Sequence, residues 1–196
     1  YPKDEIAGGT WIGTSNKNRL VCLLNGGYEN HIRKLPYKMS RGIIVKNILA
    51  ADDGVTYINE FDFDNIEPFT LVLIDWNNGL FAYELVWDGV QKHFKKLSKE
   101  PKIWSSSTLY TEEMKTSRKK WFDDFLSANN LFHQEEVLKF HQNEKLGTPE
   151  TSIKMKRDFV ETVSITSIIK SDLEIKIDYL DFVSQTNTEQ KKLIIL

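Results

Sequence analysis

The stretch FTLVLIDWNNGLFAYELVW, residues 69–87, decides the fold of this chain. Two apolar runs, Phe69–Trp76 and Leu80–Trp87, flank the turn sequence NNG at residues 77–79, and this combination predicts a β-hairpin. Neither run has a polar face that would point to solvent, so the hairpin is expected to lie between two covering layers. The sequence therefore predicts two stacked antiparallel sheets with helices on the outside.

Outward from the hairpin, hydrophobic patterns predict further strands and helices. The remaining strands are expected at residues 10–14, 19–25, 90–97, 103–107, 159–169 and 173–180. Helices are expected at residues 41–51, after a cap at Thr111, and at residues 133–142. Because strands and helices occur in separate blocks, the expected fold class is α+β rather than doubly wound α/β. One domain is expected over residues 1–183, followed by a polar tail at residues 184–196.

The composition excludes several classes of partner. A net charge of −2 on 196 residues gives no electrostatic reason to expect a nucleic acid or an anionic membrane. No apolar run approaches the about 18 residues that a membrane-spanning helix needs. The single cysteine, Cys22, cannot form an internal disulfide, so a cytoplasmic location is the default expectation. Composition leaves the oligomeric state open.

The segment VCLLNGG, residues 21–27, raises the question of a nucleophile. Cys22 lies in the middle of a predicted strand beside Leu20 and Leu24, without a histidine or a cation next to it. Such a cysteine is expected to be a small core residue rather than a reactive thiol. The histidines show no spacing typical of a metal site, so neither a metal nor a cofactor is predicted. They are His31, His93, His133 and His141.

The order and spacing of three short motifs together are more specific than any one of the motifs alone. The motifs are GGTW at residues 8–11, LLNGG at 23–27 and SRG at 40–42. With NIEPFTLVLID at residues 65–75 and IWSSSTLY at 103–110, they resemble a bacterial form of the NRDE family, also called the transport and Golgi organisation protein 2 family. The similarity extends from about Gly8 to Tyr179. This family is similar in turn to choloylglycine hydrolases and penicillin V acylases, which are N-terminal-nucleophile hydrolases with an αββα four-layer sandwich.

That resemblance implies how a reaction would be catalysed. Such enzymes begin with a cysteine whose free α-amine acts as the base for its own thiol. This sequence contains neither that leading cysteine nor the tetrapeptide Asn-Arg-Asp-Glu. The nucleophile, and the N-terminal strands of the sandwich, are therefore expected in a segment before Tyr1. The chain as it stands is expected to be inactive.

The resemblance also implies a site at the end of the strand that contains Cys22. Asn25 falls where the acylases have an oxyanion-hole residue, and Gly26 and Gly27 would let a ligand approach the backbone closely. The alternative is that Asn-Gly-Gly is only a turn. Ser106 stands where the acylases have an asparagine, a departure that leaves one donor instead of two.

Two arginines complete the candidate binding residues. Arg118 matches a helical arginine of the acylases, although a solvated charge on the polar side of its helix is the alternative. Arg41 begins a predicted helix, where a cation opposes the helix macrodipole. This position predicts that Arg41 has a partner carboxylate or a ligand.

Two functions follow from the resemblance. The first is an amidohydrolase-like domain that acts on a small amide. The alternative is a non-enzymatic carrier or chaperone for a hydrophobic ligand such as haem or an acyl compound, because the family has been linked to haem trafficking and to acyl-group metabolism. A third possibility, a bare interaction module, has no feature in its favour.

Overall fold

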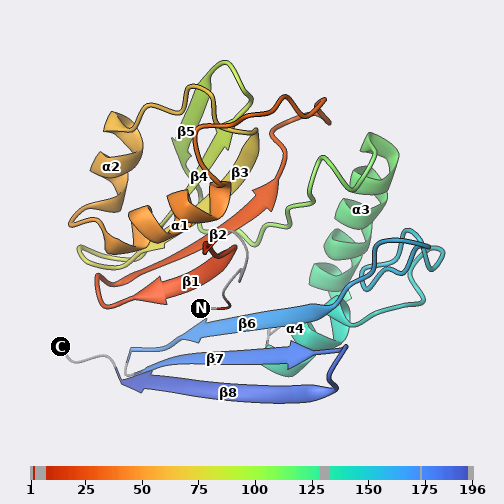
Figure 1. Cartoon of the computed structure of the whole chain (residues 1–196). Helices are drawn as coiled ribbons and strands as arrows, with labels where there is room; N and C mark the ends of the chain where they lie inside the picture. The colour runs from red at the N-terminus through yellow and green to blue at the C-terminus, as the bar shows by residue number, and fades with distance from the viewer. Residues whose placement is uncertain (1, 3–7, 129–132, 173, 194–196) are drawn as a thin grey trace. The chain divides into compact units, whose positions relative to one another are not determined.

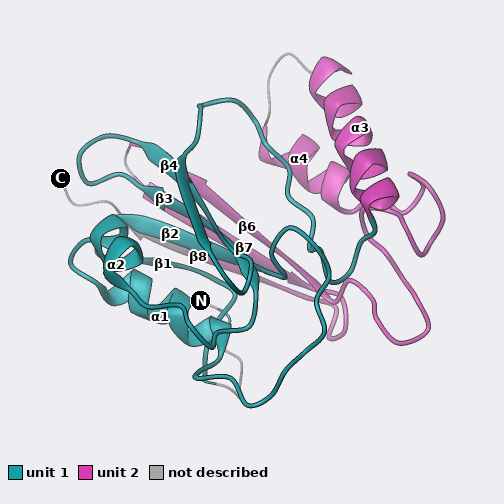
Figure 2. Ribbon diagram, turned by 90° about the horizontal axis from the view of Figure 1, so that it is seen from above, with its two compact units in different colours: residues 1–111 teal, residues 112–196 magenta. Residues whose placement is uncertain are grey.

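The structure, a computed structural model, describes residue 2 and residues 8–128, 133–172 and 174–193. Within these residues the chain has two antiparallel sheets and four helices (Figure 1), which confirms the predicted α+β class. It divides into two compact units, residues 1–111 and residues 112–196 (Figure 2). In the described residues, no helix combines the length and the hydrophobicity needed to cross a membrane.

The first unit is built on a five-stranded antiparallel sheet in which neighbouring strands follow one another along the chain. Its strands are β1 (Ile12–Ser15), β2 (Arg19–Asn25), β3 (Phe69–Asp75), β4 (Phe81–Trp87) and β5 (Lys92–Lys96). The hairpin predicted at residues 69–87 is present as β3 and β4, with Phe69 opposite Trp87 and Asp75 opposite Phe81. On its other side β3 pairs with β2, where Asn25 lies opposite Phe69.

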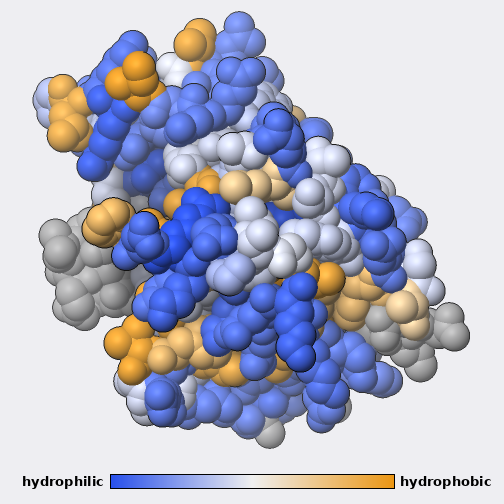
Figure 3. Space-filling view, turned by 90° about the vertical axis from the view of Figure 1, so that its right-hand side faces the viewer, coloured by the Kyte–Doolittle hydropathy of each residue, from blue (hydrophilic) through white to orange (hydrophobic). Residues whose placement is uncertain are grey.

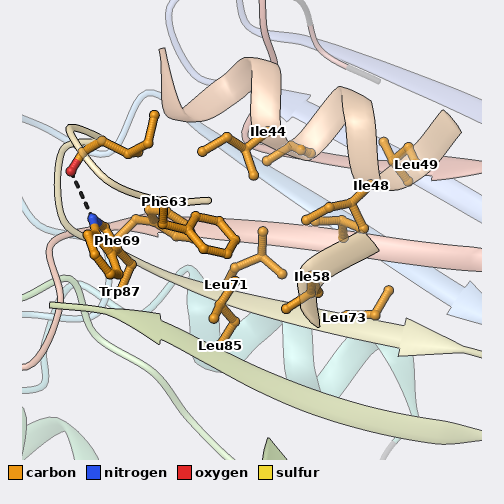
Figure 4. Packing of buried hydrophobic residues seen from close by; sticks show 13 residues of the cluster. Ile44, Ile48, Leu49, Ile58, Phe63, Phe69, Leu71, Leu73, Leu85 and Trp87 are labelled. Atoms are coloured by element: carbon orange, nitrogen blue, oxygen red, sulfur yellow. Dashed lines mark hydrogen bonds between the residues drawn. The ribbon is translucent and has the colours of Figure 1, made fainter. Parts of the chain in front are cut away.

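Two helices, α1 (Arg41–Ala50) and α2 (Gly54–Glu60), cover one face of this sheet (Figure 1). Ser40 caps α1 by accepting a hydrogen bond from the Gly42 amide, as its position predicts. The sequence did not reveal α2, which Asp53 caps by accepting from Thr56 N at 2.6 Å. Figure 4 shows the core between helices and sheet, where Trp87 Nε1 donates to Ile66 O at 2.8 Å. Its fully buried side chains include Val21, Ile44, Val45, Ile48, Ile58, Phe69, Leu71, Leu73 and Leu85.

The end of α1 is held by an arginine from β2. Arg19 is fully buried, and its Nη1 donates to Ile48 O and to Ala51 O, each at 2.9 Å. Its Nη2 donates to Asp52 O at 2.9 Å, and its Nε lies 3.5 Å from the Asp75 carboxylate. The last carbonyls of a helix have no partner within the helix, and α1 has no basic residue of its own in its last turn. Arg19 therefore supplies that partner from the sheet.

The motifs GGTW and SRG meet where α1 begins. Thr10 N donates to Gly42 O at 3.2 Å, so the two segments cross backbone to backbone. A Cβ on Gly9 would lie 2.6 Å from the carbonyl carbon of Gly42, and a Cβ on Gly42 would lie 2.9 Å from Thr10 N. Real Cβ atoms do not approach backbone atoms so closely, so both glycines are required for packing.

The second unit contains the remaining elements. They are α3 (Glu112–Ala128), α4 (Gln134–His141), β6 (Ser164–Lys170), β7 (Glu174–Asp181) and β8 (Thr186–Leu193), with the strands in the order β6-β7-β8. Residues 186–193 were expected to belong to a polar tail, but they pair along the whole of β7. The strand expected at residues 103–107 is absent, and Phe159, expected to begin a strand, lies outside β6 and is 97% exposed. On the face drawn in Figure 3, hydrophobic side chains are scattered among hydrophilic ones.

Candidate functional site

The turn after β2 is held by hydrogen bonds from three directions. Ser106 Oγ donates to Asn25 O at 2.7 Å. Gly26 N donates to Pro68 O at 3.0 Å, and Thr70 Oγ1 donates to Gly26 O at 3.1 Å. These bonds fix the backbone that follows the Asn25 side chain.

The side chain of Asn25 itself is exposed. Its carboxamide has no hydrogen-bond partner among the residues that the structure describes. Strand residues alternate between faces, so Asn25 shares a face with Val21 and Leu23 and points away from the face of Cys22. The result is an amide group with two N–H donors and one acceptor on a fixed backbone, available to a ligand.

Gly26 and Gly27 have packing reasons to be glycine. Gly26 has a φ of +87°, and a Cβ there would lie 2.1 Å from Ser107 Oγ. A Cβ on Gly27 would lie 3.0 Å from Trp87 O. The space beside Gly26, where the sequence predicted the approach of a ligand, is occupied by Ser107.

Ser106 lies beside Asn25, and its hydroxyl points to the backbone. It is buried, and the proton of Oγ is used in the bond to Asn25 O. Ser106 Oγ also lies 3.0 Å from Thr108 Oγ1, which then donates to it. With its hydroxyl engaged in this way, Ser106 holds the Asn25 backbone in position. Neither Asn25 nor Ser106 lines the hollow beside Glu84 that is described below.

Arg41 has the carboxylate partner that its position predicts. Its Nη2 lies 3.3 Å from Glu67 Oε2, and its Nη1 donates to Pro68 O at 3.0 Å. Burial lowers the pKa of Arg41 from its usual value, Glu67 raises it, and Arg33 lowers it. Two further basic groups contact the same carboxylate: His31 Nε2 at 3.4 Å and Arg33 Nε at 3.5 Å from Glu67 Oε1.

We call these four residues, His31, Arg33, Arg41 and Glu67, the Glu67 cluster. Sequence reasoning identified only Arg41 among them. The other three lie in irregular segments, where no periodicity marks a residue as important. The available signals for these residues were two short features of the sequence. One is the basic segment HIR, residues 31–33, before SRG, and the other is Glu67, which precedes Pro68 and the first residue of β3.

Arg118 belongs to the second unit and is buried, so the alternative of a solvated charge is wrong. Its Nη1 donates to Thr151 O at 3.1 Å and to Ser152 O at 2.6 Å. Its Nη2 donates to Ile153 O at 3.2 Å. These bonds fasten α3 to the loop before β6, which gives Arg118 a structural role within its own unit.

The structure gives no activated nucleophile at Cys22. Burial raises the pKa of its thiol to about 11, so the thiol is protonated at neutral pH. Among the described residues, no three or more histidine, cysteine, aspartate or glutamate side chains come together in a way that would hold a metal ion.

A second polar cluster lies on the sheet face opposite the helices. Glu84, on β4, is buried, and its carboxylate contacts Lys95 Nζ at 2.8 Å, Lys102 Nζ at 2.7 Å and Trp104 Nε1 at 2.6 Å. Beside it is a hollow of about 700 Å³. Its lining includes Val72, Ile74, Leu80, Phe81, Leu97, Lys99 and Trp104.

The contacts of Glu84 predict that the folded protein loses stability in acid. Burial acts to raise the pKa of Glu84, but the hydrogen bonds from Lys102, Lys95 and Trp104 outweigh it and lower the pKa from 4.5 to about 2. The ionised Glu84 carboxylate contributes to the free energy of unfolding. Because the folded pKa of Glu84 lies below the unfolded one, this contribution is complete above about pH 4.5 and is lost as the pH falls towards 2.

Unfolding by urea between pH 6 and pH 2.5 tests this. We expect the free energy of unfolding of the wild type to fall more steeply below about pH 4.5 than that of Glu84→Gln, which carries no titrating group there. Parallel curves for the two proteins would contradict the assignment. Asp64→Asn, a change at an exposed carboxylate, is the control and should follow the wild type.

Comparison with known proteins agrees with the sequence motifs. No curated protein matched the chain. The family model described as Transport and Golgi organisation 2 matches residues 1–188, nearly the whole length. The match includes GGTW, LLNGG and SRG, the motifs that carried the resemblance. The chain therefore belongs to the Transport and Golgi organisation 2 family.

Proposed function

We propose that this chain forms the ligand-binding part of an N-terminal-nucleophile-type amidohydrolase that acts on a small amide. The observation that carries the proposal is the Asn25 carboxamide, which is exposed on a backbone fixed by Ser106, Gly26 and Thr70. A donor that is already in position, aimed at a carbonyl oxygen, stabilises the negative charge that develops there without reorganisation. Asn25 would supply this donor.

The nucleophile in this proposal comes from a segment before Tyr1. Two features support an external nucleophile: the protonated thiol of Cys22 and the engaged hydroxyl of Ser106. We also propose an αββα sandwich for the whole domain. In support, α1 and α2 cover one face of the first sheet, and in the second unit Gln134 of α4 bonds to Ser167 of β6 at 3.1 Å.

Removing the Asn25 amide tests the function. In the native protein that contains this chain, Asn25→Ala is expected to lower kcat/KM for N-acyl amides by at least about tenfold, because a transition-state donor is lost. Asn78→Ala is the control, since Asn78 is another exposed asparagine and lies in the turn between β3 and β4. An Asn25→Ala protein as active as the wild type would make Asn25 only a turn residue.

The second candidate function is a carrier for a hydrophobic ligand such as haem or an acyl compound. The hollow of about 700 Å³ beside Trp104 favours it, because most of the side chains that line it are apolar. Binding of such a ligand, detected by quenching of tryptophan fluorescence and unchanged by Asn25→Ala, would favour the carrier over the hydrolase.

A further inference from the structure

A turn in the second unit carries a phenylalanine that is almost completely exposed to solvent. Residues 156–161 form this turn, in which Arg157 N donates to Val160 O at 2.9 Å. We call it the Phe159 turn, after the residue at its tip, which is 97% exposed. A single exposed hydrophobic residue is common on protein surfaces and needs no partner. The surroundings of Phe159 therefore decide whether it has a binding role.

Hydrogen bonds hold the backbone at the base of the Phe159 turn in place. Thr162 N donates to Met155 O at 2.9 Å, and Met155 N donates to Thr162 Oγ1 at 3.1 Å. Arg157 Nε donates to Glu150 O at 2.9 Å. Because the turn is already ordered, a surface that bound Phe159 would restrict little further conformational freedom of the chain. Phe159 is thus presented on a fixed support.

Beside the base of the Phe159 turn lies a hollow of about 510 Å³, and all the residues that line it belong to the second unit. We call it the Phe182 hollow. Val163 is 50% exposed and Val183 is 73% exposed, so its apolar lining extends to the surface. A hollow of this size with an apolar lining suits an aromatic ring. Its apolar lining residues are Pro149, Met155, Val163, Phe182 and Val183.

The charges around the Phe182 hollow match those of the Phe159 turn. Lys156, which lines the hollow, lies with its Nζ 3.7 Å from Glu161 Oε2, and its side chain is 80% exposed. Asp158 precedes Phe159 at the tip of the turn and is exposed. A Phe159 ring that entered the hollow of a second copy would bring Asp158 to an edge where Lys156 of that copy can pair with it. Because both copies carry the same residues, this contact can form twice about a twofold axis.

We propose that the Phe159 turn and the Phe182 hollow form a self-complementary docking surface, in which each hollow holds Phe159 of a second copy of this chain. The 97% exposure of Phe159 means that its ring does not enter the hollow of its own chain. The contact between one turn and one hollow is small, so the resulting dimer is weak and forms in a concentration-dependent way.

Sedimentation equilibrium of the native protein that contains this chain, over a series of concentrations, tests the proposal. We expect the wild type to show a monomer–dimer equilibrium. Phe159→Ser should weaken the dimer by at least about tenfold, because each dimer loses two buried phenyl rings. Val90→Ser is the control, since Val90 is an exposed hydrophobic residue of the first unit and is 79% exposed. Its dimer should be as stable as that of the wild type.

A mixture of two variants tests whether Phe159 enters the Phe182 hollow. Val183→Asp places a charge in the hollow and leaves Phe159 intact, whereas Phe159→Ser leaves the hollow intact. Each variant alone should dimerise weakly. Mixed together, they should associate more tightly than either does alone, because one intact turn then meets one intact hollow.

Three outcomes would overturn the proposal. The first is a wild type that stays monomeric even at about 100 μM. The second is a mixture that associates no better than its two components, because Phe159 would then bind another surface. The third is a fall in the Tm of Phe159→Ser together with the loss of the dimer, because the ring would then stabilise its own chain. An unchanged Tm with a weakened dimer supports the docking surface.

Discussion

Replacing Arg19 with methionine is expected to lower the free energy of unfolding by about 3–5 kcal/mol, as when one partner of a buried ion pair is removed. Methionine keeps an unbranched apolar stem but has no donor. The carbonyls of Ile48 and Ala51 would lose their hydrogen bonds in a buried place, and Asp75 would lose its cation. Urea denaturation followed by circular dichroism measures the effect.

Lys17→Met is the matched control for this change. Lys17 Nζ contacts Asp52 at 2.6 Å, close to the Asp52 carbonyl that Arg19 binds, but Lys17 and Asp52 are exposed. Exposed ion pairs contribute about 0–1 kcal/mol, so Lys17→Met should change stability little. If Arg19→Met lost no more stability than Lys17→Met, the proposed capping of α1 by Arg19 would be wrong.

Gly26→Ala is expected to have the second-largest effect on stability, a loss of about 2–4 kcal/mol. A side chain at φ +87° is strained by about 1–2 kcal/mol, and the new methyl group would overlap Ser107 Oγ in a buried place. Ser107 Oγ donates to Glu29 O at 3.0 Å, so moving it breaks a further bond. Thermal unfolding reports the loss as a lower Tm.

Gly79→Ala separates the two contributions. Gly79 has a φ of +102°, and a Cβ there would meet only the Phe81 ring at 3.5 Å, an ordinary contact. It should therefore show the backbone strain alone and lose less stability than Gly26→Ala. Equal losses would mean that Ser107 moves aside without cost, and the tight packing around the turn would be refuted.

The elements that the sequence predicted are those with local signals. The hairpin of β3 and β4 follows from two apolar runs around NNG, and α1 follows from a Ser40 cap with apolar residues at helical spacing. The elements that were missed lack such signals. Helix α2 is short and begins with Asp53-Gly54, which reads as a turn. Strand β8 has a polar sequence without a hydrophobic pattern, and its described side chains, residues 186–190, are exposed. Backbone pairing with β7 holds it in the sheet.

The candidate site could be predicted only in part for a similar reason. Asn25 and Ser106 are far apart in the sequence, and only the family resemblance indicated that they lie together. The role of Ser106 in holding the Asn25 carbonyl depends on a hydroxyl direction that the sequence does not encode locally. The Glu67 cluster joins residues 31–41 to residue 67, and long-range ion pairs between irregular segments leave no periodic pattern.

The order of strands in the first sheet has a consequence for folding kinetics. Strands β1 and β2 are joined by a short turn, as are β3 and β4, and β4 and β5. Only β2 and β3 meet across a long interval, residues 26–68, which contains α1 and α2. The entropy lost on closing a loop grows with its length, and such non-local pairings slow folding. The pairing of β2 with β3, which ends at Asn25, is thus the pairing within this sheet that closes the longest loop and has the largest entropic cost of closure.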